Sequence, residues 1–245
     1  MLTTPYLLFT AAAAATPMAC AATPVLPKTG TGKDLPAPPA GAILKHIALG
    51  FGIQNYTCAR VGATPDAAGA LAMLYDIASL YPGQGSDSLS LEGFEALPTV
   101  ALWSHRVPLN LQRSTGGRGD PHYPGASPTK PFPPDAPLQL SGIKPLPFLG
   151  HHFFNSNNVP TFVLDGGKIN LPAAKLNAVD APSRASRGPE DTGAVNWLYL
   201  GPKDGTAVGA KYVYRVLTAG GASHGCSKAA GPDSTSYAAT YWFYG

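Results

Sequence analysis

The sequence has little charge, and none of its apolar runs is long. Acidic and basic residues make up 13% of the 245 positions, and the formal net charge is only +3. Nucleic-acid-binding domains usually carry clustered lysine and arginine and a stronger positive charge, so we expect no nucleic-acid partner. A transmembrane helix needs about 20 apolar residues in a row. No stretch of the sequence reaches that length, and we expect no membrane span.

Cysteine is also scarce, with three residues in the chain. The first, Cys20, lies near the end of residues 1–22, where an apolar, alanine-rich run ends in small residues. This pattern predicts a secretory signal peptide and a secreted, extracellular protein. The first ten residues contain no lysine or arginine, and Cys20 leaves a lipid-anchored form open, although Pro17 and Met18 are unusual beside a lipidation site.

Two cysteines, Cys58 and Cys226, remain once such a signal is removed. In an oxidising compartment a disulfide is the expected fate of the pair. Two buried free thiols are the alternative.

Glycine and proline, in contrast, are abundant, with 28 and 26 residues. A turn-rich, weakly charged chain of this kind is typical of secreted β proteins. Residues 23–40 are rich in proline and predict an extended linker or an arm on the surface. We expect residues 41–245 to form a single β-rich domain with a Pro/Gly-rich loop insertion at about 106–147.

The last third of the chain, residues 194–245, carries the clearest structural signal. Three runs rich in Val, Tyr and Trp are separated by turn residues, which predicts a β-meander. Large side chains fall on both faces of these runs, so the sheet should be covered on both sides. The predicted fold class is all-β and mainly antiparallel, either a β-sandwich or a barrel-like domain.

Three earlier segments give weaker signals. Residues 43–58 alternate with period two and predict a strand. Residues 160–171 predict a hairpin around the turn at Asp165-Gly166. By local rules, residues 64–80 form a helix, with Thr64 as N-cap and Pro65 in the first turn.

Several segments together resemble a known family. They are residues 50–58 (GFGIQNYTC), 160–162 (PTF), 196–198 (NWL), 214–226 (YRVLTAGGASHGC) and 237–244 (YAATYWFY). Their combination is similar to the secreted, mostly fungal family catalogued as domain of unknown function 3455. The resemblance implies an uncharacterised secreted protein, paired cysteines at Cys58 and Cys226, and extended structure in place of a helix over residues 69–76.

Members of that family often carry the label malate dehydrogenase. This chain has no Gly-x-Gly-x-x-Gly turn between a strand and a helix, and no acidic residue at the distance that a ribose contact needs. We therefore reject that activity and expect no cofactor.

Histidine is the first residue type to consider for chemistry. His151 and His152 are adjacent, so in a strand they point to opposite faces and cannot both bind one metal ion. A metal site would need His105, His122 or His224 to converge on one of them. The alternative is that His151 and His152 are half-buried aromatic partners, and we predict no metal site.

No nucleophile or carboxylate pair stands out. Ser104-His105 and Ser223-His224 each place a hydroxyl beside an imidazole in sequence, but adjacent residues rarely have the geometry of a catalytic triad. Glycosidase activity remains an open alternative, because the two carboxylates of such an enzyme come together in the folded protein and need not be close in sequence. The available carboxylates are Asp76, Asp87, Glu92, Glu95, Asp165, Asp180, Glu190 and Asp191.

Aromatic residues are the better lead. We expect Trp103, Tyr56 and Tyr123 to be exposed and free to stack on sugar rings, whereas Trp197 and Trp242 should fill the core.

Two short motifs are also present. Asn55 begins a glycosylation sequon, and residues 118–120 match the Arg-Gly-Asp adhesion tripeptide, which occurs often by chance.

The leading hypothesis is a non-enzymatic protein that binds an extracellular glycan or a cell-wall component. Its candidate binding residues are Trp103, His151, His152 and Tyr56. The competing hypothesis is an extracellular hydrolase acting on a polymer, with carboxylates or the two histidines at the rim of a pocket. A planar Trp/Tyr strip favours binding, and a deep cleft with two carboxylates, or with His and Asp, favours hydrolysis.

Overall fold

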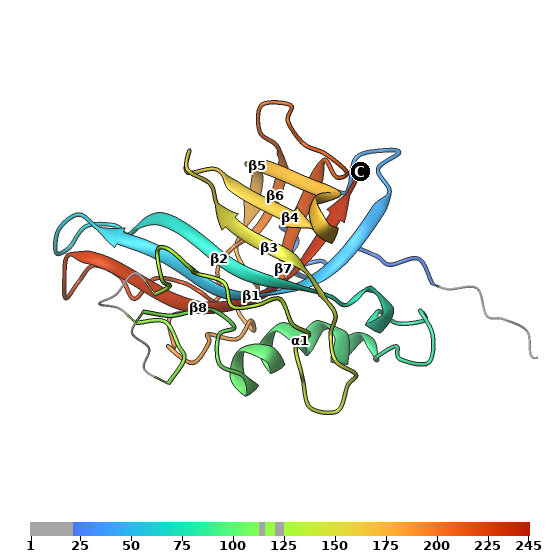
Figure 1. The fold of residues 1–245 in the computed structure, drawn as a ribbon, viewed down its shortest axis with the longest axis horizontal. Coiled ribbons are helices and arrows are strands. Elements are labelled where there is room, and N and C mark those ends of the chain that lie inside the picture. The colour runs from blue at the N-terminus through green and yellow to red at the C-terminus, as the bar shows by residue number, and fades with distance from the viewer. Residues whose placement is uncertain (1–21, 113–115, 121–124) are drawn as a thin grey trace, which may run out of the picture.

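Eight antiparallel strands close into a barrel in which every strand pairs with its neighbours in the sequence (Figure 1). The structure is a computed structural model that describes residues 22–112, 116–120 and 125–245. Pairing of β1 with β8 closes the barrel. The strands are β1 (Leu44–Cys58), β2 (Asp66–Asp76), β3 (Phe148–Phe154), β4 (Pro160–Leu164), β5 (Ile169–Val179), β6 (Trp197–Pro202), β7 (Tyr212–Gly220) and β8 (Gly231–Tyr244).

Side chains of the long strand β8 alternate between the barrel interior and a second core outside it. Tyr237, Ala239, Tyr241 and Phe243 pack in the interior, whereas Ala238, Trp242 and Tyr244 pack in the outer core. The adjacent strand β1 makes room for these rings with glycine. A Cβ atom at Gly50 would lie 2.4 Å from Cε2 of Tyr241. The sequence thus builds a barrel covered on one outer face, as the two-sided aromatic pattern predicts.

A helix, α1 (Leu91–Ser104), lies along the outer face of the barrel beneath β1 and β8 (Figure 1). Ser90 caps it, since its hydroxyl accepts a hydrogen bond from the Gly93 N–H at 3.1 Å. Phe94 meets Trp242 of β8 edge to face, at 6.4 Å between ring centroids. The sequence analysis did not foresee this helix, which supplies the cover over Trp242.

The predicted meander and hairpin are both present. Strands β6, β7 and β8 pair in order, and β4 and β5 form the hairpin, joined by a short 3-10 turn, Asp165–Gly167. The helix predicted by local rules over residues 64–80 is wrong. That segment forms β2, because pairing with both β1 and β3 outweighs the helix propensity of its alanines and leucines. The extended structure implied by the family resemblance is confirmed.

The two proline-rich segments pack against the domain. In residues 23–40, Leu26 and Leu35 contact the outer core, and the Val25 N–H donates to Tyr81 Oη at 3.0 Å. In the described part of residues 106–147, isolated bridges join Leu111 to Ala126 and Leu138 to Leu146. The predicted signal peptide lies outside the described residues except for Ala22. No helix among the residues that the structure describes is long and apolar enough to cross a membrane.

The predicted disulfide is confirmed. Cys58 at the end of β1 is bonded to Cys226 in the loop before β8, with 5.4 Å between their Cα atoms and a sequence separation of 168. Both cysteines are buried. The bond therefore fixes one end of the β1–β8 ladder that closes the barrel.

Removing this disulfide should strongly destabilise the protein. For a loop of 168 residues, the chain-entropy model gives a stabilisation of about 5 kcal/mol. We expect the double variant Cys58→Ala, Cys226→Ala to lose most of that amount in equilibrium urea unfolding. Wild-type protein unfolded in a thiol reductant serves as the control and should match the variant. A variant as stable as the oxidised wild type would contradict the prediction.

Candidate functional site in the barrel interior

One half of the barrel interior is open and forms a cavity of about 480 Å³. Every strand contributes at least one lining residue. The cavity reaches the surface, because Ala67, Lys175 and Asn196 in its lining are exposed. The strand residues that line it are Gln54, Tyr56, Ala67, Ala70, His152, Phe154, Pro160, Phe162, Lys175, Leu198, Leu200, Arg215 and Tyr241.

The other half of the interior is filled by side chains. Leu74, Leu164, Leu171, Val213 and Phe243 are all buried in one cluster there. Phe162 and Tyr241 belong to that cluster and also line the cavity, so they form its floor. Towards the opening, small side chains at Ala67 and Ala70 leave the space unfilled. The cavity thus results from a change in side-chain size along the barrel axis.

Arg215 of β7 is the charged group deepest in this site. It lies opposite Leu198 of β6 and Tyr241 of β8 in the two ladders, so it shares their interior face. The residue is only 8% exposed. Its Nε and Nη2 donate to the carbonyl oxygen of Asn196, at 3.3 and 2.9 Å. Within the described part of the chain, no carboxylate oxygen lies within ion-pair distance of it.

Two tyrosines and a glutamine add polar groups beside Arg215. The hydroxyls of Tyr237 and Tyr241 are 2.9 Å apart and hydrogen-bonded. Burial raises the pKa of both phenols, although the positive charge of Arg215 opposes the shift. Gln54 is 8% exposed, and its buried Nε2 makes no hydrogen bond within 3.5 Å, although its interaction with the Tyr237 hydroxyl acts to lower the pKa of that phenol. The inner wall therefore holds neutral hydroxyls and one amide whose donors are not fully used.

His152 is an uncharged residue in the wall of the cavity. Its ring stacks on Phe162 at 4.1 Å between centroids, and Nδ1 lies 3.0 Å from the Thr161 carbonyl oxygen. Because a carbonyl only accepts, Nδ1 must carry the proton, and Nε2 is left as an acceptor. Burial is the main cause that lowers the pKa of His152 to about 4, and the charge of Arg215 adds to it. At neutral pH the ring is uncharged.

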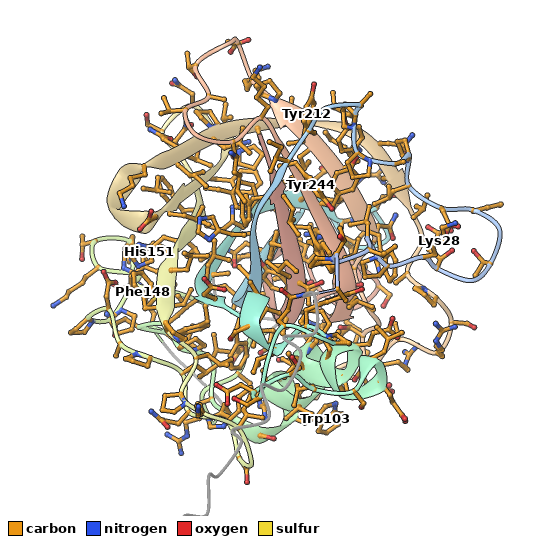
Figure 2. All side chains as sticks on the ribbon, turned by 90° about the vertical axis from the view of Figure 1, so that its right-hand side faces the viewer. Lys28, Trp103, Phe148, His151, Tyr212 and Tyr244 are labelled. Carbon is orange, nitrogen blue, oxygen red and sulfur yellow. A yellow bond between two sulfur atoms is a disulfide. The ribbon has the colours of Figure 1, made fainter. Side chains whose placement is uncertain are left out.

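The structure brings two of the predicted binding residues together and leaves two elsewhere. Tyr56 and His152 both line the cavity, and Tyr56 Oη donates to the Gly221 carbonyl at 2.6 Å. Figure 2 shows Trp103 and His151 at separate places on the molecule. Trp103 is on α1, 56% exposed, and donates to Ser186. His151 faces outward and packs on Phe132 at 4.2 Å between ring centroids.

Arg215, Gln54 and Tyr241 were not among the predicted site residues. The one available signal was an arginine on the same face of a meander strand as Val213 and Leu217. Trp197 and Trp242 are buried, as predicted. Tyr123, His122 and Cys20 lie outside the described residues.

A second polar cluster lies beside the disulfide. Asp233 accepts hydrogen bonds from Ser223 Oγ at 2.5 Å and from the His224 N–H at 2.9 Å, and its Oδ1 is 2.8 Å from His224 Nδ1. The hydrogen bond to Asp233 raises the pKa of His224, and the pKa of Asp233 itself is lowered by hydrogen bonds that outweigh its burial. Ser223 is bonded to the carboxylate and not to the imidazole. This arrangement ties the loop together and is not a nucleophile–base pair.

The remaining candidates do not assemble into a site. The described residues contain no group of three His, Cys, Asp or Glu side chains that could hold a metal ion. Ser104 and His105 lie at the C-terminal end of α1. In the Arg-Gly-Asp tripeptide, Arg118 donates to the Leu102 carbonyl and Gly119 is buried against β8, where its N–H donates to Ser236 Oγ at 2.9 Å.

Comparison with known families now places the chain. Residues 39–245 match the model of the family described as "Protein of unknown function (DUF3455)". Because the match covers most of the chain, the protein belongs to this family. No curated protein and no solved structure matches it. The match identifies the family of this chain and assigns it no activity.

His152 should make the protein sensitive to mild acid. The unfolded imidazole takes up a proton below a pH of about 6.5, whereas the folded one does so only near its pKa of about 4. Protonation therefore favours the unfolded state, and stability falls as the pH drops between these values. The expected loss at pH 4 is about 3 kcal/mol.

The variant His152→Phe keeps the aromatic stack and removes the titration, so its unfolding free energy should fall less between pH 7 and pH 4. The measurement is urea unfolding at a series of pH values. His105→Gln, at the end of α1, is the control and should follow the wild type. Equal pH dependence in His152→Phe and wild type would show that the imidazole is not the group responsible.

Proposed function

We propose that this protein is a non-enzymatic binding protein that holds a small, largely apolar organic molecule inside its barrel. The observation that carries the proposal is the cavity of about 480 Å³, with lining residues on all eight strands. Small-molecule sites in proteins typically have about 300–1,000 Å³, mostly apolar walls and a few polar groups. Closed barrels of about eight strands are just wide enough to hold one small ligand.

The chemistry of the walls supports binding over hydrolysis. Among the residues that the structure describes, none that lines the cavity is Asp or Glu, so the paired carboxylates of a glycosidase have no counterpart in this lining. His152 is neutral, and its Nδ1 is engaged by a backbone carbonyl. Beside the lining residue Ser223, His224 pairs with Asp233, and the Ser223 hydroxyl is bonded to that carboxylate.

A glycan-binding surface has less support. Trp103 is the one exposed Trp, Tyr or Phe in the described part of the chain, and its indole N–H is already bonded to Ser186. Sugar-binding platforms use several coplanar rings. A single partnered indole does not provide one, so the barrel interior is the stronger candidate.

Secretion forms part of the proposal. The Cys58–Cys226 bond favours an oxidising compartment. The N-terminal sequence pattern points the same way. An extracellular carrier or scavenger of a small molecule would fit both features.

Blocking the opening should abolish ligand binding. We expect wild-type protein to bind the neutral fluorophore N-phenyl-1-naphthylamine with increased fluorescence. Ala67→Trp places an indole in the cavity lining and should weaken this binding by about tenfold or more. Titrations followed by fluorescence give the dissociation constants.

Ala68→Trp is the matched control. Ala68 is the next residue of β2, is also exposed and is not among the lining residues of the cavity, so its variant should bind like the wild type. No binding of the fluorophore to wild-type protein, or equal weakening by both substitutions, would overturn the proposed function.

A further inference from the structure

We infer that the ligand is an amphipathic organic anion whose acidic head sits on Arg215 and whose apolar body lies against Phe162, Leu198 and Leu200. This inference rests on the proposed function and names the chemical class of its ligand. The inference comes from the groups that lie side by side in the barrel interior. A buried cation and a buried amide nitrogen that makes no hydrogen bond within 3.5 Å face a cavity that has no acidic residue among its described lining residues.

Arg215 has more donors than its two protein partners, the Asn196 carbonyl oxygen and the Tyr241 hydroxyl, use. Guanidinium carries five N–H donors in a planar fork, which matches a carboxylate in two parallel hydrogen bonds. Here the Asn196 carbonyl oxygen takes both of the bonds from Nε and Nη2. A neutral carbonyl also leaves the charge uncompensated. A buried charge is costly unless it is paired, and an anionic ligand supplies the missing pair.

The field of Arg215 extends over the cavity. Its charge acts to lower the pKa of His152 and of the phenols of Tyr56, Tyr237 and Tyr241, which lie on three other strands, β1, β3 and β8. Lys175, at the exposed rim of the same cavity, adds a second positive charge. The interior is therefore electropositive, and a cationic ligand would be repelled.

Gln54 supplies an independent indication. Gln54 is more than nine-tenths buried and lines the cavity, yet its Nε2 makes no hydrogen bond within 3.5 Å and interacts only more weakly with the Tyr237 hydroxyl. A buried amide donor without a partner costs free energy, which a ligand oxygen would recover. Gln54 and Arg215 both donate, so the complementary ligand group is an acceptor with more than one oxygen.

The rest of the lining limits how polar the ligand can be. Phe154, Pro160, Phe162, Leu198 and Leu200 present carbon to the cavity. A sugar or a sugar phosphate needs hydrogen-bonding partners on several sides, which this wall lacks. A single acidic head with an aliphatic or aromatic body matches both the polar and the apolar parts of the site.

The decisive test compares octanoate with octanol on the wild-type protein. Each displaces N-phenyl-1-naphthylamine, and the fluorescence gives its inhibition constant. Octanol is the more hydrophobic molecule, so an apolar site would prefer it. We expect octanoate to bind at least about tenfold more tightly at pH 7.4, because it forms the charge-assisted bonds to Arg215.

Substitution then locates the head group. Arg215→Met should weaken octanoate binding by about tenfold or more and leave octanol within about threefold. Lys203→Met removes one exposed charge outside the cavity lining and should change neither value. Near-ultraviolet circular dichroism checks that each variant is folded. If Arg215→Met does not fold, Gln54→Leu replaces it, with the same sign expected and a smaller effect.

The outcomes separate the two proposals. Binding of the fluorophore with octanol equal to or tighter than octanoate overturns the anion inference and leaves the proposed function in place. The same holds if Lys203→Met weakens octanoate as much as Arg215→Met does. Absence of fluorophore, octanol and octanoate binding overturns both.

Discussion

The pairing of β1 with β8 is the constraint on which the rest of the molecule depends. These strands begin and end the domain, and their ladder runs from Leu44–Tyr244 to Cys58–Gly231. Bringing such distant segments together costs chain entropy, which the disulfide reduces by joining Cys58 to the loop that leads into β8. With this ladder in place every strand of the barrel has a neighbour on each side, and the sheet closes on itself. Only a closed sheet of this kind has an inside that can be partly empty.

The same ladder decides which half of the inside is empty. Gly50 and Gly52 of β1 lie opposite Ala239 and Tyr237 of β8, so large rings from one strand fill the space that the other leaves. On the other side of β1, a Cβ atom at Gly52 would lie 1.8 Å from the Leu71 carbonyl oxygen of β2, so that strand also leaves no room for a side chain there. Beyond Gly52, β1 continues with Gln54 and Tyr56, whose polar ends replace the packed core. The floor of the cavity is thus a consequence of how two adjacent strands share volume.

Local sequence signals revealed the strands better than they revealed the site. The meander and the hairpin were predictable because alternation and turn residues act over a few positions, as in Asp165–Gly167. Helix and strand were confused over residues 66–76, where alanine-rich propensity opposes pairing on both sides. The helix Leu91–Ser104 was missed, since Pro98 lies within it and a Pro/Gly/Ser-rich stretch precedes it. The cavity could not be foreseen, because its walls come from eight strands and no two of its polar residues form a motif.

Arg215 and Gln54 make sense as recognition groups and not as stabilising ones. A barrel of this size can fill its interior with apolar side chains, and replacing a buried charge by a hydrophobic residue is often neutral or stabilising. Arg215 has only neutral partners, a backbone carbonyl and the Tyr241 hydroxyl, and Gln54 Nε2 makes no hydrogen bond within 3.5 Å, so neither group is fully compensated by the protein. Arg215 and Gln54, whose burial costs free energy, both lie where the packed half of the interior meets the open half. Uncompensated donors placed there favour a fold that is completed by an acceptor from outside the chain.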